Sequence, residues 1–304
     1  MKLCCTSSVS LHSTLGEIIV GSRYLCALIA AVGCALLAAC AGDATSSAPH
    51  ADSALPAAAA RGPVSAGAPS ATRRTLSAAN CNGAPLGSNA FVGGGVSTIA
   101  AGNTSFVGAG NSNEACDVSS AVVGGFSNVI ASGNGTGAAY SFIGGGAQNL
   151  ISAGAVDSAV VSGYENAAAG DDSFVGGGAN NTLNNGATDG VLVGGEYNVV
   201  SSQYGFLGGS RSNTVSGEGA YIAAGGFNVA SGEGAVVDGG FNSTASGAFA
   251  TIPGGYVNSA GGTYSFAAGA RASAPYAGDF VWSDGSDGDT ILTAAKAYQF
   301  VARA

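Results

Sequence analysis

The chain has 304 residues, of which 52 are glycine, 46% are hydrophobic and only 9% are charged. Glycine is far above its usual frequency of about 7% but does not recur at every third position, which excludes collagen; the hydrophobic content excludes ordinary disorder, which requires low hydrophobicity and high charge. Such a composition is typical of repeat proteins, in which backbone hydrogen bonds and stacked columns of side chains replace a thick core.

The charge of the chain excludes one class of partner. The whole sequence carries a net charge of -9, and residues 89–273 contain eleven acids but only two bases, Arg211 and Arg271. Phosphate contacts require clustered Lys and Arg, so nucleic acid is excluded as a partner. The only two histidines, His12 and His50, precede this region, which therefore has no histidine for catalysis or for binding a metal.

The first 40 residues have the features of an export signal. Residues 24–41 contain no charge, and a transmembrane helix is one interpretation of this run. The run contains Leu37-Ala-Ala-Cys40, however, which resembles the lipobox of bacterial lipoproteins, whose cysteine is acylated and becomes the new N-terminus after cleavage. We therefore predict a signal peptide over residues 1–40 and lipidation of Cys40, with an ordinary signal peptide as a further alternative. Ala41, rather than Asp, follows the cysteine, so the resemblance points to the outer membrane. We expect the lipoprotein to be exposed at the cell surface.

Residues 41–80 are rich in Ala, Ser, Pro and Gly and show no sustained period. We predict that this segment is a disordered, flexible tether between the lipid and the folded part. Contact of Arg61, Arg73 and Arg74 with anionic headgroups is an alternative to a plain solvated linker.

Two of the seven cysteines lie beyond the leader and the lipidated residue. Cys81 and Cys116 form an even pair in an exported chain, and their spacing suits a disulfide that fastens the first coils of a repeat. Two unpaired buried thiols are the alternative.

A frame of nine recurring positions runs through residues 89–273: small, variable, aliphatic, variable, small, Gly, variable, variable, Asn. One copy is Ser141-Phe-Ile-Gly-Gly-Gly-Ala-Gln-Asn149. Twelve copies follow one another, most at steps of 14 to 17 residues, with one step of 21 around residues 133–139. Two short strands and two turns fit each step, which predicts an all-β parallel β-solenoid of about twelve coils with one bulging loop.

Three columns of this frame carry the prediction. The third position is a branched aliphatic in eleven of twelve copies and should form an interior ladder: Val92, Val107, Val122, Ile143, Val160, Val175, Leu192, Leu207, Ile222, Val236 and Ile252. The sixth is Gly in ten copies, as a corner with positive φ requires. The ninth is Asn in ten copies, whose side chains can bond from coil to coil: Asn113, Asn128, Asn149, Asn166, Asn181, Asn198, Asn213, Asn228, Asn242 and Asn258. A second buried strand residue is expected two positions later, at Ile130, Ile151, Leu183, Val200 and Val215.

The second position is rich in aromatic residues: Phe91, Phe106, Phe142, Phe174, Phe206, Tyr221 and Phe266. Neighbouring strand residues point to opposite faces, so this column points outward if the third column points inward. An aromatic stripe of this length is too apolar to leave in water, and we predict that it is a subunit interface. The alternative is that the two faces are exchanged and the aromatic side chains fill the roll.

The repeated Ser-Phe-Val-Gly-Gly-Gly and the segment Ser265-Phe-Ala-Ala-Gly-Ala-Arg-Ala-Ser273 resemble the head repeats of trimeric autotransporter adhesins, the YadA-like left-handed parallel β-roll. The resemblance covers about residues 89–273. It implies a homotrimer at the cell surface that binds host matrix, host cells or other bacteria. The sequence shows neither a heptad-bearing stalk nor a C-terminal membrane barrel, so we expect the lipid on Cys40 to replace the barrel.

We assign residues 81–273 to the head repeats. The frame is lost over residues 274–304, and we predict that this segment forms a C-terminal cap. We predict short strands at residues 280–282 and 298–301. Asp284, Asp287 and Asp289 lie in a Gly-rich loop with carboxylates suited to Ca²⁺, but their spacing matches no full calcium motif and favours a solvated turn.

These features predict a non-catalytic adhesin without cofactor or metal. A β-helix enzyme is the second hypothesis, but the acids of the repeat are scattered, it has no lysine, and Asp171-Asp172 is its only adjacent acid pair. An ice-binding solenoid would show a regular Thr array and a calcium-repeat solenoid a Gly-Gly-x-Gly-x-Asp repeat, and the columns of this frame show neither. A structural spacer or envelope lipoprotein without a specific ligand remains the main alternative to an adhesin.

Overall fold

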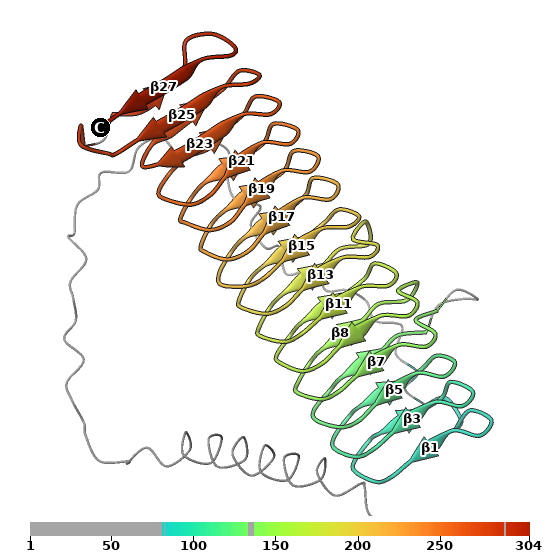
Figure 1. Cartoon of the computed structure of the whole chain (residues 1–304). Coiled ribbons are helices and arrows are strands. Elements are labelled where there is room, and N and C mark those ends of the chain that lie inside the picture. Colours follow the sequence, from blue (N-terminus) through green and yellow to red (C-terminus); the bar gives the residue numbers. More distant parts are fainter. Residues whose placement is uncertain (1–80, 82, 133–136, 289) are drawn as a thin grey trace, which may run out of the picture. The chain divides into compact units, whose positions relative to one another are not determined.

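The structure is a computed structural model that describes residues 81, 83–132, 137–288 and 290–304. All the regular elements among these residues are strands, and they form two parallel sheets. The odd-numbered strands make a 14-stranded sheet, here the odd sheet, and the even-numbered strands a 13-stranded sheet, the even sheet. Successive strands alternate between the sheets, so the chain winds through about 13 turns (Figure 1). The predicted parallel β-solenoid is confirmed.

Most strands are two residues long. The odd sheet consists of β1 (Phe91–Val92), β3 (Phe106–Val107), β5 (Ala121–Val122), β7 (Phe142–Ile143), β9 (Ala159–Val160), β11 (Phe174–Val175), β13 (Val191–Leu192), β15 (Phe206–Leu207), β17 (Tyr221–Ile222), β19 (Val236–Val237), β21 (Thr251–Ile252), β23 (Phe266–Gly269), β25 (Phe280–Ser283) and β27 (Phe300–Arg303). The even sheet consists of β2 (Ile99–Ala100), β4 (Glu114–Ala115), β6 (Val129–Ile130), β8 (Leu150–Ile151), β10 (Ala167–Ala168), β12 (Thr182–Leu183), β14 (Val199–Val200), β16 (Thr214–Val215), β18 (Val229–Ala230), β20 (Thr244–Ala245), β22 (Ser259–Ala260), β24 (Ala272–Ala274) and β26 (Leu292–Thr293). We number the coils from the N-terminal end, so that coil 1 contains β1 and β2, and coil 2 contains β3 and β4.

The core is a double ladder of aliphatic side chains between the two sheets. Ile143 of the odd sheet and Ile151 of the even sheet are both fully buried, and equivalent residues of the other coils stack above and below them. Val92, in the end coil, is only partly buried. The 21-residue step leaves both ladders in register, because Val122 still pairs with Ile143 and Ile130 still pairs with Ile151. The additional residues of that step therefore fall in the sequence between β6 and β7.

In coil 10, the predicted positions of the buried aliphatic residue and of the asparagine were each wrong by one residue. Val237, not Val236, is the buried residue, because β19 pairs Tyr221 with Val236 and Ile222 with Val237. The Asn position is likewise filled by Ser243 instead of Asn242, which lies in the preceding turn with φ 53°. Two adjacent valines satisfy the aliphatic column equally well, so only the hydrogen-bond register decides between them.

The C-terminal strands continue the two sheets. β25 and β27 pair in parallel with β23 and with each other, and β26 pairs with β24. Coil 12 has one residue fewer in its turn, so the ninth position falls on Ala272, whose N–H donates to Asn258, and not on Ser273.

The corner at the sixth position requires a left-handed backbone. Gly195 has φ 89°, and a Cβ there would collide with the carbonyl oxygen of Ser210 in the next coil. Ser210 is a non-glycine residue in this column and has φ 75°. The bond from the Arg211 N–H to the Gly225 oxygen is 3.3 Å long beside it, compared with 2.8 Å from Glu196 to Ser210 one coil earlier. A side chain at this corner is therefore costly.

We expect Ser210→Gly to stabilise the protein by up to about 1 kcal/mol, because it relieves a left-handed non-glycine residue. Gly195→Ser, which creates the same arrangement one coil earlier, should destabilise the protein. Thermal unfolding followed by circular dichroism measures both. Equal melting temperatures for the two variants would contradict this account of the corner.

Candidate interaction face

The aromatic residues of the second position point away from the core. Phe91 is 57% exposed, while Phe106, Phe142 and Phe174 are 38–39% exposed. Phe206, Tyr221 and Phe266 are partly exposed in the same column. The alternative in which aromatic side chains fill the roll is therefore wrong. We call the outward side of the odd sheet, at frame positions two and four, the aromatic face.

The rings stack along the solenoid where neighbouring coils both carry one. The ring centroids of Phe206 and Tyr221 lie 5.0 Å apart with an interplanar angle of 13°. At the C-terminal end, Phe280 lies 4.6 Å from Phe266 and 4.9 Å from Phe300. Phe280 and Phe300 thus extend the aromatic face beyond the predicted residues, because the last strands continue the same column.

The fourth position, treated as variable in the sequence, compensates for the second. In coils 1–8 every Phe at position two is accompanied by Gly at position four: Phe91 with Gly93, Phe106 with Gly108, Phe142 with Gly144, Phe174 with Gly176 and Phe206 with Gly208. In coil 12, Phe266 is accompanied by Ala268. Coils 3, 5 and 7 carry Ala or Val at position two and an exposed valine at position four: Val123, Val161 and Val193. The bulk of the face therefore stays nearly constant over coils 1–8.

Ring positions explain the pairing of Phe with Gly. A Cβ built on Gly144 would lie 3.2 Å from the Cε1 atom of Phe142 and would also collide with the carbonyl oxygen of Val161. The ring therefore lies along its own strand over the glycine, and the next coil approaches closely. The result is a level apolar surface without a charged residue until Asp238 in coil 10. The signal in the sequence was the correlation between two positions of one coil, which a column-by-column analysis misses.

The asparagine column holds the turns beside this face. Asn181 is fully buried, and its amide group donates to the carbonyl oxygens of Gly177 at 3.0 Å and Gly195 at 2.8 Å. Its Oδ1 atom accepts from the N–H and the amide of Asn198, each at 3.1 Å. Apart from Asn242, the predicted asparagines take part in this chain of bonds; coil 10 uses Ser243 in its place.

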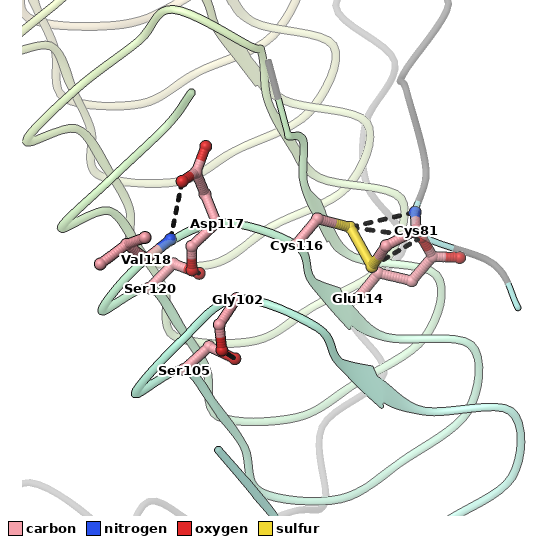
Figure 2. Close-up of a disulfide and its surroundings, with 8 residues drawn as sticks. All are labelled: Cys81, Gly102, Ser105, Glu114, Cys116, Asp117, Val118 and Ser120. Atoms are coloured by element: carbon pink, nitrogen blue, oxygen red, sulfur yellow. Dashed lines mark hydrogen bonds between the residues drawn. A yellow bond between two sulfur atoms is a disulfide. The ribbon is translucent and has the colours of Figure 1, made fainter. Parts of the chain in front are cut away.

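Cys81 and Cys116 form a disulfide (Figure 2), which excludes the pair of free thiols. Their Cα atoms are 5.5 Å apart, and the bond links residues separated by 35 positions. Oε2 of Glu114 accepts the N–H of Cys81 at 3.0 Å and lies 3.8 and 3.7 Å from the sulfur atoms of Cys81 and Cys116. Sequence reasoning missed Glu114, the single acid in the outward column of the even sheet.

These three residues are the one group in the described part of the chain whose Cys, His, Asp or Glu atoms lie close enough to hold a metal ion. Zinc binds cysteine as thiolate, and the sulfurs of a disulfide carry no such charge. The oxidised protein therefore uses this group to fasten the chain.

Burial raises the pKa of Glu114 above its ordinary value of 4.5, although the N–H of Cys81 opposes the shift. Between the unfolded and native pKa values, the native state binds more protons than the unfolded state, so stability falls as pH rises through that interval. We expect Glu114→Gln, which keeps an acceptor for Cys81, to flatten this dependence and to raise the melting temperature at neutral pH. Glu218→Gln, at an exposed turn, is the control. Coincident profiles for the two variants would contradict the role given to Glu114.

The aspartates of the C-terminal loop are held by Arg303. Its Nη1 atom lies 2.6 Å from Asp287, and its Nε atom lies 3.9 Å from Asp284. Two hydrogen bonds from Ser286, with a smaller contribution from Arg303, hold the pKa of Asp284 below its ordinary value. These carboxylates tie the loop to β27. Asp289 lies outside the described residues.

The adjacent acids Asp171 and Asp172 are exposed at the turn before β11. Asp171 accepts the N–H of Val156 at 2.9 Å, which is a contact within the turn region. The predicted lipidation site Cys40 and the tether arginines Arg61, Arg73 and Arg74 lie outside the described residues. Within the residues that the structure describes, none forms a helix of the length and apolarity needed to cross a membrane.

No protein-family model matches the chain, and no curated protein has a matching sequence. The parallel β-solenoid is compatible with a β-roll.

Proposed function

We propose that this chain is a non-catalytic, surface-displayed adhesin head, a left-handed β-roll of the YadA-like kind that works as a homotrimer. The aromatic face carries the proposal. A contiguous apolar surface of this extent is typical of an interaction site in a soluble protein. Its evenness from coil to coil, maintained by the exchange of Phe-Gly for Ala-Val, is what close packing against another flat surface requires.

A second and third copy of the same chain suit this face. In a parallel trimer with a threefold axis, equal coils lie at equal heights, so each phenylalanine level meets the same level of its neighbours. The aromatic face carries no charge in coils 1–9, so like-charge repulsion enters such a contact only from Asp238 in coil 10, whereas the net charge of the repeat region is -9. The remaining surface, with its acidic turns, stays in water.

The proposed attachment is a lipid on Cys40, with residues 41–80 as the tether. The disulfide supports export, because disulfides form and persist in oxidising compartments outside the cytosol. An adhesin held in this way would display its head at the outer surface, with host matrix, host cells or other bacteria as binding partners.

Binding of the purified protein to immobilised matrix proteins, glycans and whole cells tests the adhesive function. We expect saturable binding to at least one of these surfaces, lost on heat unfolding. An assembled, lipidated protein that binds none of them would contradict adhesion and would favour a structural spacer or envelope lipoprotein. Palmitate labelling of the unaltered chain and of Cys40→Ser tests the anchor separately.

A further inference from the structure

Coil 1, at the N-terminal end of the solenoid, is bonded to a neighbouring coil on one side only. β1 pairs only with β3, and β2 pairs only with β4, whereas the strands of coil 2 have neighbours on both sides. Phe91 is 57% exposed, and Val92 is partly buried where its successor Val107 is completely buried. Because each coil of a solenoid is stabilised by its neighbours, unravelling starts from an end.

The disulfide encloses this coil. It joins Cys81, before coil 1, to Cys116, directly after β4 in coil 2 (Figure 2). We infer that the Cys81–Cys116 bridge carries a pull on the N-terminal side of the chain past coil 1 and into coil 2, so that the end coil bears no load. The biological role of this bridge rests on the proposed function, in which an adhesive head is attached to the membrane through its N-terminal side.

Without the bridge, a pull at residue 81 would peel coil 1 from coil 2. Only one interface would have to open, a ladder of backbone bonds that includes Phe91 N–H to Ser105 O at 3.0 Å and Ile99 N–H to Asn113 O at 2.9 Å. Bonds opened one after another from an edge resist little force, because each carries the load alone.

With the bridge, the same pull passes through the two sulfur atoms to Cys116 and then along the chain to coil 3. Coil 3 lies between two coils: the Ser120 oxygen accepts from Phe106 of coil 2, and the Ala121 N–H donates to Ser141 of coil 4, each at 2.9 Å. Its extraction requires two interfaces to open together. The first unravelling step is therefore more difficult than peeling of an end coil.

Further contacts hold the chain in place before coil 1. The N–H of Cys81 donates to Glu114 at 3.0 Å, which seats the bridge on β4. Closer to coil 1, Gly87 donates to the Ala100 oxygen at 3.0 Å, and Ser88 donates to the Asn103 side chain at 3.0 Å. The covalent bond thus lies upstream of weaker contacts and shields them from load.

Single-molecule pulling of the full chain tests the inference, with one peptide tag at the N-terminus and a second inserted in the exposed turn at Asn185. The C-terminal end coil, where β27 pairs only with β25, then carries no load. The same molecules are compared before and after reduction with dithiothreitol. For the oxidised chain we expect the first unravelling event at about twice the force seen after reduction, since two interfaces instead of one must open. The fully extended oxidised chain should also be about 120 Å shorter, because the bridge removes 35 residue steps of up to about 3.6 Å each.

Cys81→Ser with Cys116→Ser should behave like the reduced protein, and Glu114→Gln should keep the bridge and the high force. Hydrogen exchange gives a second measurement: reduction should speed exchange at Gly93, Val96 and Ile99 and leave coil 7 unchanged. If the oxidised chain starts to unravel at the same force as the reduced one, the inference is wrong even where the lengths differ. Because the tags replace the natural attachment, failure of the adhesion or lipid proposals leaves this outcome unaffected.

Discussion

Asn181→Ala should destabilise the protein by about 3 kcal/mol. The substitution removes the donor to the carbonyl oxygens of Gly177 and Gly195 and the acceptor for the Asn198 N–H. The Gly195 oxygen keeps the Ala179 N–H as a donor, but the Gly177 oxygen and the Asn198 N–H lose their partner, and each buried polar group left without its partner costs about 1–3 kcal/mol. Thermal and urea unfolding followed by circular dichroism measure the loss.

Asn185→Ala is the matched control, since Asn185 is exposed at a turn four residues away. It should change stability by less than about 0.5 kcal/mol. Ser243→Asn tests the same column in the opposite direction, because it supplies the missing amide in coil 10 and should stabilise the protein by about 1 kcal/mol. Equal effects of Asn181→Ala and Asn185→Ala would show that the asparagine column does not hold the coils together.

The periodic features of the fold could be predicted because every coil repeats the same physical demand. Aliphatic side chains such as Val107 and Ile143 recur at one position, and a corner that requires positive φ selects glycine. The prediction failed where two residues met the demand equally, as Val236 and Val237 did. The hydrogen-bond register, which pairs Val237 with Ile222, decides between them. A single column of the sequence does not contain this register.

Features that depend on contacts between different columns could not be predicted from the sequence. Glu114 looks like an ordinary surface acid until the disulfide brings Cys81 against it. The level aromatic face needs positions two and four to be considered together, as in Phe142 and Gly144. The residues of the site were therefore visible in the sequence, but the relation between them was not.

Phe142→Glu combined with Phe174→Glu should convert the proposed trimer to a monomer that keeps its fold. Both rings are exposed, 39% and 38%, so a carboxylate replaces each one without entering the core. In the assembly, however, three copies of each charge would meet in an apolar contact, and unpaired charges buried there are strongly unfavourable. Equilibrium sedimentation should show the mass falling to one third, while the circular dichroism spectrum is unchanged.

Leu150→Glu with Thr182→Glu places the same charges in the same two coils, but on the outward side of the even sheet. This control should remain assembled, and its dissociation would contradict the assignment of the interface to the aromatic face. Ala121→Phe tests the levelness of that face more finely. Its ring would meet Val123, with no glycine to lie over, and should weaken assembly, whereas Ala121→Phe with Val123→Gly recreates the pattern of Phe106 and Gly108 and should restore it. The double variant has less apolar surface at position four than the single variant Ala121→Phe. If it nevertheless assembles better, the interface depends on close packing, because hydrophobicity alone would favour the single variant.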